Sequence, residues 1–155
     1  MEIQHSYGVS VEWLGNRGTG TSDYKSYGRE NAISAVGKPS IEGSADRAFR
    51  GDTDRWNPEE LLLAALSECH MLSYLHVAAT KGIVVTSYTD ATTGTMLQTN
   101  NGGGHFTEVT LHPVVTIAAG DPELANSLHH EASELCFIAA SINFPLHHDV
   151  TIITA

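Results

Sequence analysis

Two cysteines are the residues of this sequence with the widest chemical range. The chain of 155 residues contains only Cys69 and Cys136. A thiolate attacks electrophiles, and two thiols that meet can be oxidised to a disulfide and reduced again. Free Cys is also often an inert buried residue, so composition alone leaves both interpretations open. In a reducing compartment a permanent structural bridge is not expected, and a pair that does form there is transient and catalytic.

A reactive thiolate at Cys69 needs a nearby positive charge. The adjacent Glu68 opposes ionisation, and Cys69 lies beyond the first turn of its predicted helix, where the helix dipole acts. Arg is the natural source of charge because a guanidinium is always protonated. A buried Arg needs a carboxylate, for which Glu59 and Glu60 are available, although both also suit a helix start. The Arg candidates all precede the helix: Arg17, Arg29, Arg47, Arg50 and Arg55.

Nine histidines raise the question of a metal site. After His130, Glu134 stands where an HExxH motif needs its second His. Neighbouring residues on one helix or strand point in different directions, so two adjacent His side chains are not expected to bind the same metal ion. The adjacent pairs are His129 with His130 and His147 with His148. We therefore expect no metal and no other cofactor.

The segment around Cys69 has the pattern of a long helix. Asn57 can cap its first turn, Pro58 fits that turn, and Glu60 can complete a capping box. The pattern runs to about Lys81, where Gly82 ends it. Spacings of three and four predict one inward-facing stripe, formed by Leu62, Ala65, Leu66, Cys69, Leu72, Ser73 and His76.

The remaining segments complete an α+β order. Alternating stretches in the first 50 residues predict three or four short antiparallel strands. Two β-rich segments, 83–96 and 105–118, flank a Gly-rich loop and predict a long hairpin. Asp121 and Pro122 start a second helix, and residues 150–153 suit a last strand. The second helix has an inward stripe that would bring its Cys towards the first helix: Ala125, Leu128, Ala132, Leu135, Cys136 and Ala139.

Length and composition predict one globular domain over residues 1–155, without repeats or a linker. Eight Lys and Arg stand against eighteen Asp and Glu, and the net charge of -10 opposes binding to nucleic acid and to anionic membranes. The N-terminus lacks a signal-peptide pattern, and no apolar run approaches the ~20 residues that span a bilayer. We expect a cytoplasmic protein, with neither nucleic acid nor a membrane as partner.

Two segments resemble the OsmC/Ohr family (osmotically induced protein C and organic hydroperoxide resistance protein), in its OsmC-like branch. The run NPEELLLAALSECH, from Asn57 to His70, is similar to the family's first cysteine segment, with a Glu ten positions before the Cys. The run ELCFIAASINFPL, from Glu134 to Leu146, is similar to the second. His70 departs from the Phe common after the first Cys; we interpret it as a partly exposed side chain, with proton transfer as the alternative. Phe137 departs from the Pro common after the second.

The resemblance implies a thiol-dependent peroxidase that reduces organic hydroperoxides. Cys69 is then the peroxidatic residue, Cys136 the resolving residue, and Glu59 the carboxylate that holds an Arg against the thiolate. A dithiol reductant, of lipoyl type by family analogy, would reopen the disulfide. The implied fold is an OsmC/Ohr-like intertwined homodimer. The alternative is a non-enzymatic module that senses redox state or binds a small molecule, and turnover separates the two.

The resemblance also implies a position for the activating Arg. In OsmC-like members it comes from the strand before the NPE segment. Arg50 is favoured because it stands between Phe49 and Gly51, in a pattern like the family's Phe-x-Gly. Arg47 and Arg17 stay as alternatives.

Overall fold

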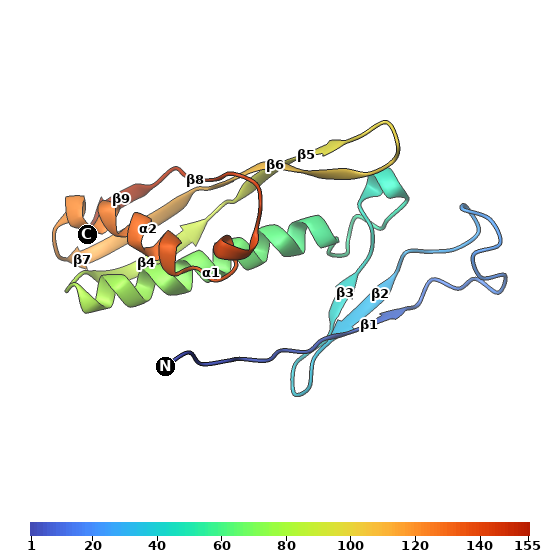
Figure 1. The fold of residues 1–155 in the computed structure, drawn as a ribbon, viewed down its shortest axis with the longest axis horizontal. Helices are drawn as coiled ribbons and strands as arrows, with labels where there is room; N and C mark the ends of the chain where they lie inside the picture. Colours follow the sequence, from blue (N-terminus) through green and yellow to red (C-terminus); the bar gives the residue numbers. More distant parts are fainter. The chain divides into compact units, whose positions relative to one another are not determined.

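The computed structural model describes all 155 residues, and these divide into two compact units, Met1–Leu61 and Leu62–Ala155 (Figure 1). The division falls within the long helix α1 (Pro58–Thr80). Strands, a long helix, a hairpin, a second helix and further strands follow in order, which confirms the predicted α+β class. The prediction of a single domain over 1–155 stays a prediction.

The first unit is built on a three-stranded antiparallel sheet in the order β1-β2-β3. Its strands are β1 (Ser10–Trp13), β2 (Asn31–Ser34) and β3 (Ile41–Gly43). A short 3-10 helix, η1 (Arg47–Phe49), follows and ends at Arg50, whose φ of 65° lies in the left-handed region. The predicted N-terminal strands are confirmed.

The start of α1 is held by the predicted capping box. The backbone N–H of Glu60 donates to Oδ1 of Asn57 at 2.8 Å, and the backbone N–H of Asn57 donates to Oε2 of Glu60 at 3.3 Å. These bonds satisfy amides that have no partner inside the helix. At the other end Gly82 has a φ of 77°, which a residue with a side chain rarely adopts.

The predicted hairpin of the second unit is present, but it is bent into two three-stranded sheets. Strand β4 (Val84–Asp90) pairs antiparallel with β7 (Pro113–Ala119), and β5 (Thr93–Gln98) with β6 (Gly104–Leu111). Two late strands then add in parallel: β8 (Leu146–His148) beside β6 and β9 (Thr151–Thr154) beside β7. The sheet orders are β4-β7-β9 and β5-β6-β8.

A half-buried carboxylate, Asp90, holds the bend between β4 and β5. It accepts hydrogen bonds from Oγ of Ser67 at 2.6 Å, Oγ1 of Thr92 at 2.8 Å and the backbone N–H of His112 at 2.7 Å. Hydrogen bonds to an ionised group are the stronger kind. Asp90 therefore links the break between β4 and β5 and the break between β6 and β7 to α1. Its contact on α1 is Ser67, which lies two residues before Cys69.

Both helices of the second unit pack on one face of the β4-β7-β9 sheet. Helix α2 (Pro122–Leu135) begins at an Asp121 cap, as predicted. Figure 1 shows α1 running along the sheet with α2 beside it. The shared core is formed by Tyr74, Val77, Ala78, Ile83, Val115, Ile117, Ala125, Leu128 and Ala132.

The predicted stripe of α1 is wrong in part. Leu72 is 56% exposed and His76 is exposed, whereas His70, expected to be partly exposed, is fully buried. The buried residues of the helix are Leu66, His70, Tyr74, Val77 and Ala78. Both stripes satisfy helical spacing, and the buried one includes polar side chains whose partners lie on α2. Because these partners are far away in the sequence, the local pattern does not indicate which of the two stripes is buried.

Helix α1 is the one helix that is long and apolar enough, by length and composition, to cross a membrane. This differs from the expectation that no such run exists, because polar residues interrupt an otherwise apolar segment of mean hydropathy 1.3. Helices in protein cores meet the same criteria, and Tyr74 and Val77 of α1 pack in the core of the second unit. We therefore interpret α1 as a helix that packs one face in the core of the second unit, while only 28% of its apolar window is buried within one chain.

Candidate active site

The two cysteines meet in the second unit. Cys69 lies in the middle of α1 and is partly exposed, whereas Cys136 directly follows α2 and is fully buried. The thiol of Cys69 lies close enough to that of Cys136 to raise its pKa. The chain thus brings together two sulfurs that are 67 positions apart in sequence, as the two facing stripes suggested.

Cys136 is held as a thiol at neutral pH. Burial raises its pKa to about 11, and the neighbouring Cys69 thiol adds to this effect. The backbone N–H of Ala139 donates to Sγ of Cys136 at 3.4 Å and acts in the opposite direction, but it does not outweigh burial. Of the two sulfurs, the partly exposed Cys69 is therefore the one that an incoming substrate can reach.

An apolar cluster lies next to both cysteines in the chain. One turn before Cys69, Leu66 is fully buried against Val109 and Leu111. The short 3-10 helix η2 (Ala139–Ser141), just after Cys136, contributes Ala139 to the same cluster. The other residues packed against it are Leu62, Leu63, Phe106, Ile142, Phe144 and Leu146.

The second unit offers the thiol pair almost no positive charge. It contains no Arg, and its single Lys is Lys81, just after the end of α1. Lys81 follows Cys69 by twelve residues, a rise of about 18 Å along a helix. Every Arg of the chain belongs to the first unit. The second unit therefore supplies no guanidinium for a thiolate at Cys69.

Within the first unit, three of the five Arg residues already have partners. Arg17 pairs with Glu30, and Arg55 lies 3.7 Å from Glu42. The guanidinium of Arg29 lies over the rings of Tyr24 and Tyr27. Arg47 and Arg50 form no ion pair. The carboxylate oxygen Oε2 of Glu59 is buried without a hydrogen-bond partner, which is costly for a charged group.

The family model described as OsmC-like protein matches residues 51–151, well over half of the chain. The chain belongs to the OsmC-like protein family. The match covers both cysteines and all of α1, and it confirms the resemblance of the two cysteine segments to the OsmC/Ohr family. A comparison with curated proteins finds no match.

Solved structures of OsmC-like proteins share this fold. An OsmC-like protein of unknown function from Vibrio cholerae is 28% identical, with a TM-score of 0.84 over 95% of this chain and 99% of that one. An organic hydroperoxide resistance protein from Elizabethkingia anophelis, with thiocyanate bound, is 21% identical, with a TM-score of 0.68 over 99% and 100%. A Legionella pneumophila protein described as organic hydroperoxide resistance protein OsmC is 19% identical, with a TM-score of 0.68 over 97% and 99%. The latter two show the fold alone.

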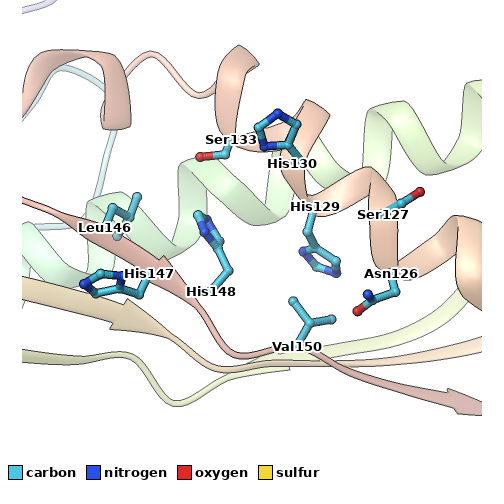
Figure 2. Close-up of a pocket in the computed structure, with 9 residues that line it drawn as sticks. All are labelled: Asn126, Ser127, His129, His130, Ser133, Leu146, His147, His148 and Val150. Atoms are coloured by element: carbon cyan, nitrogen blue, oxygen red, sulfur yellow. The ribbon is translucent and has the colours of Figure 1, made fainter.

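Sequence reasoning missed a group of histidines in this OsmC-like chain. Three of them, His70, His129 and His148, lie together in the second unit. Figure 2 shows His129 and His148 in one groove of about 710 Å³ beside α2 and β8. No group of three or more His, Cys, Asp or Glu side chains is arranged so that it could hold a metal ion. The signal available in the sequence was His70 itself, the departure after the first Cys.

Proposed function

We propose that this OsmC-like protein is a thiol-dependent peroxidase that reduces organic hydroperoxides. The observation that carries the proposal is that Cys69, which is partly exposed, lies close enough to the buried Cys136 to raise its pKa. A peroxidatic thiol needs access to substrate, and a resolving thiol needs to lie beside it. Two relatives in the fold comparison are described as organic hydroperoxide resistance proteins.

The reaction begins with attack of the Cys69 thiolate on the terminal oxygen of the hydroperoxide. The O–O bond breaks, the alkoxide takes up a proton and leaves as an alcohol, and Cys69 becomes a sulfenic acid. The Cys136 sulfur then attacks the Cys69 sulfur, water leaves with the Cys136 proton, and a disulfide forms. A dithiol reductant, such as a dihydrolipoyl group, reduces this disulfide by thiol exchange and becomes a disulfide itself.

The substrate class follows from the surroundings of the sulfurs. Leu66, Val109 and Leu111 form a buried apolar cluster one turn from Cys69. An apolar wall favours an alkyl or aryl hydroperoxide over hydrogen peroxide, because only the organic group gains from leaving water.

Arg50 and Glu59 complete the proposed machinery. Arg50 supplies the positive charge that holds Cys69 as a thiolate, and Glu59 holds the guanidinium of Arg50. Two observations support this assignment: Arg50 forms no ion pair, and Oε2 of Glu59 is buried without a partner. Arg47 and Arg17 are the alternatives, and Arg17 already pairs with Glu30.

The proposed working form is a cytoplasmic homodimer. Only 28% of the apolar window of α1 is buried in one chain, and Leu72 is 56% exposed. An apolar helix face of this kind is covered by a partner in water. A second copy of the chain covers it with a matching helix.

The test is steady-state consumption of cumene hydroperoxide with dihydrolipoamide as the reductant. Wild type should consume many equivalents, and Cys69→Ser should consume none. Ser73→Ala, one turn further along α1, is the matched control and should retain activity. Oxidation of wild type by a single equivalent without further turnover would instead indicate a redox sensor and contradict the proposal.

A further inference from the structure

Three histidines from three elements form one cluster in the second unit. His70 comes from α1, His129 from α2 and His148 from β8. His70 is fully buried, His129 is 3% exposed, and His148 is half-buried. Figure 2 shows the rings of His129 and His148 facing the same groove from opposite walls.

The cluster joins the two helices that carry the cysteines. Nε2 of His70 lies 2.9 Å from Nδ1 of His129, and the ring centre of His148 lies 4.5 Å from that of His70. Tyr74 stacks on His129 at 3.9 Å and donates its hydroxyl hydrogen to the carbonyl of Ala125 at 3.0 Å. Cys69 directly precedes His70 on α1, and Cys136 follows His129 by two helical turns.

All three side chains are held neutral. Burial lowers the pKa of His70 to about 4 and that of His129 to about 3, and the neighbouring His residues lower both further. Burial also lowers the pKa of His148. Three ring nitrogens, Nδ1 of His70 and Nε2 of both His129 and His148, are buried without a partner. If two of these rings were protonated, their positive charges would repel each other with little water to screen them.

The charged and titratable groups around the cluster would do little to stabilise positive charge on its three rings. From β4, Asp90 favours the protonated rings, but it already accepts three hydrogen bonds. Tyr88, also on β4, has its pKa raised by burial and stays neutral. His147 and His130 both oppose protonation of His148. Tyr74 of α1 stacks on His129 and, because burial raises its pKa, is neutral too. Strands β7 and β9 contribute no titratable residue.

We propose that the cluster of His70, His129 and His148 is a proton-sensitive junction, which holds α2 against α1 when neutral and releases α2 when protonated. Release carries Cys136, at the end of α2, away from Cys69. Acid would therefore slow resolution of an oxidised Cys69. This last consequence rests on the function proposed above, whereas the opening itself does not.

The direction of the pH dependence follows from linkage. In the closed form His70 and His129 bind protons only near pH 4 or below, and the pKa of His148 is lowered by burial, whereas in an open, solvated form each ring titrates near the usual value of 6.5. The open form therefore binds more protons in this interval. Each His raises the equilibrium constant for opening about tenfold for every unit of pH below 6.5, until the closed form is protonated as well. The junction is closed at neutral pH and loosens as pH falls from about 6.5 to 4.

Amide hydrogen exchange of α2 tests the junction without any peroxide. Between about pH 7 and pH 5, and after correction for intrinsic exchange rates, protection of residues 128–136 in wild type should fall by at least about tenfold. His148→Gln removes one titrating ring at the groove and should reduce this fall. His76→Gln changes an exposed His on α1 and should behave as wild type.

Equal protection at both pH values would overturn the junction, as would an equal fall in His148→Gln and wild type. If His148→Gln fails to fold, the same question is answered on wild type by following the imidazole proton resonances. They should titrate together with the loss of α2 protection, and titration near pH 6.5 with α2 still protected contradicts the proposal.

The redox consequence is read separately from the mass of the intact protein after one equivalent of cumene hydroperoxide. At about pH 5, wild type should give more sulfinic acid and less disulfide than at about pH 7, and His148→Gln should shift less. If no oxidation occurs at either pH, the peroxidase function fails while hydrogen exchange still decides the junction. If oxidation occurs with the same product ratio at both pH values, the link between junction and thiols is wrong.

Discussion

At the scale of single residues, burial separates the roles of two otherwise identical thiols. Cys136 is fully buried, and burial raises its pKa to about 11, so it stays protonated at neutral pH. Cys69 is partly exposed and lies close to it. In the proposed function, the partly exposed sulfur attacks the hydroperoxide and the buried sulfur then forms the disulfide with it.

The division of roles predicts different products for the two Cys variants. Cys69→Ser should take up no oxygen from one equivalent of hydroperoxide. Cys136→Ser should react once and then, with further hydroperoxide, be overoxidised to the sulfinic acid, because its sulfenate has lost the neighbouring thiol. Intact mass measures this directly. If wild type gains oxygen atoms and never loses two hydrogens, Cys136 is not the resolving residue.

The activating charge is tested by alkylation of Cys69 with iodoacetamide at neutral pH. Removing a cation from beside a thiolate should slow alkylation by about tenfold or more. Arg50→Asn is the preferred variant, because Asn tolerates the left-handed φ of this position better than Ala does. We expect a large effect in Arg50→Asn and little in Arg17→Ala. A large effect in Arg47→Ala with none in Arg50→Asn would move the role to Arg47.

Site residues were predictable from sequence only where a motif carries them. The Glu59 and Cys69 spacing stands out in the chain, and the two sulfurs do meet. His70 was expected at the surface, because a single His beside an apolar stripe gives no sign of its partner. That partner, His129, is 59 positions away on another helix. Contacts of this kind depend on how helices pack, which local periodicity does not encode.

At the scale of elements, Asp90 is the polar residue that fixes the bent hairpin to α1. The variant Asp90→Ala leaves the Ser67 hydroxyl and the His112 amide without their acceptor. We expect a loss of about 1–3 kcal/mol in the free energy of unfolding, measured by urea denaturation. Asp149→Ala is the matched control, because its carboxylate is 79% exposed and contacts only His112. Equal effects of the two variants would show that Asp90 does not hold the bend.

The elements themselves were predicted well at their ends and poorly in their pairing. Caps are local, so Asn57 and Asp121 marked both helix starts. The split of the hairpin into two sheets was missed, because it depends on hydrogen bonds from Ser67 and His112 to Asp90. Strand β8 was missed as well, since its three residues gain stability only from parallel pairing with distant β6. Non-local pairing of this kind leaves a weak trace in sequence.

At the scale of the whole molecule, the Arg residues are distributed unevenly between the two units. The unit with both thiols contains no Arg, and the other contains all five. Glu59 and Cys69 share one continuous helix without Pro or Gly between them. Their ten positions correspond to about 15 Å along the axis and about 80° around it. A Glu59 carboxylate that holds an Arg is thus poorly aligned with Cys69 of its own helix.

The simplest solution is a two-fold dimer in which Glu59 and Arg50 of one subunit complete the site at Cys69 of the other. The test combines two inactive subunits, Cys69→Ser and Arg50→Asn, by co-refolding in equal amounts. In a shared site the heterodimer has one centre with both groups intact, because the Cys of one chain meets the Arg of the other. Random pairing makes half of the dimers mixed, so activity should recover to about one quarter of wild type. A site built within one chain gives no recovery, since each subunit lacks one of its own groups. Recovery absent from confirmed heterodimers, or full activity in a demonstrated monomer, would remove the shared site.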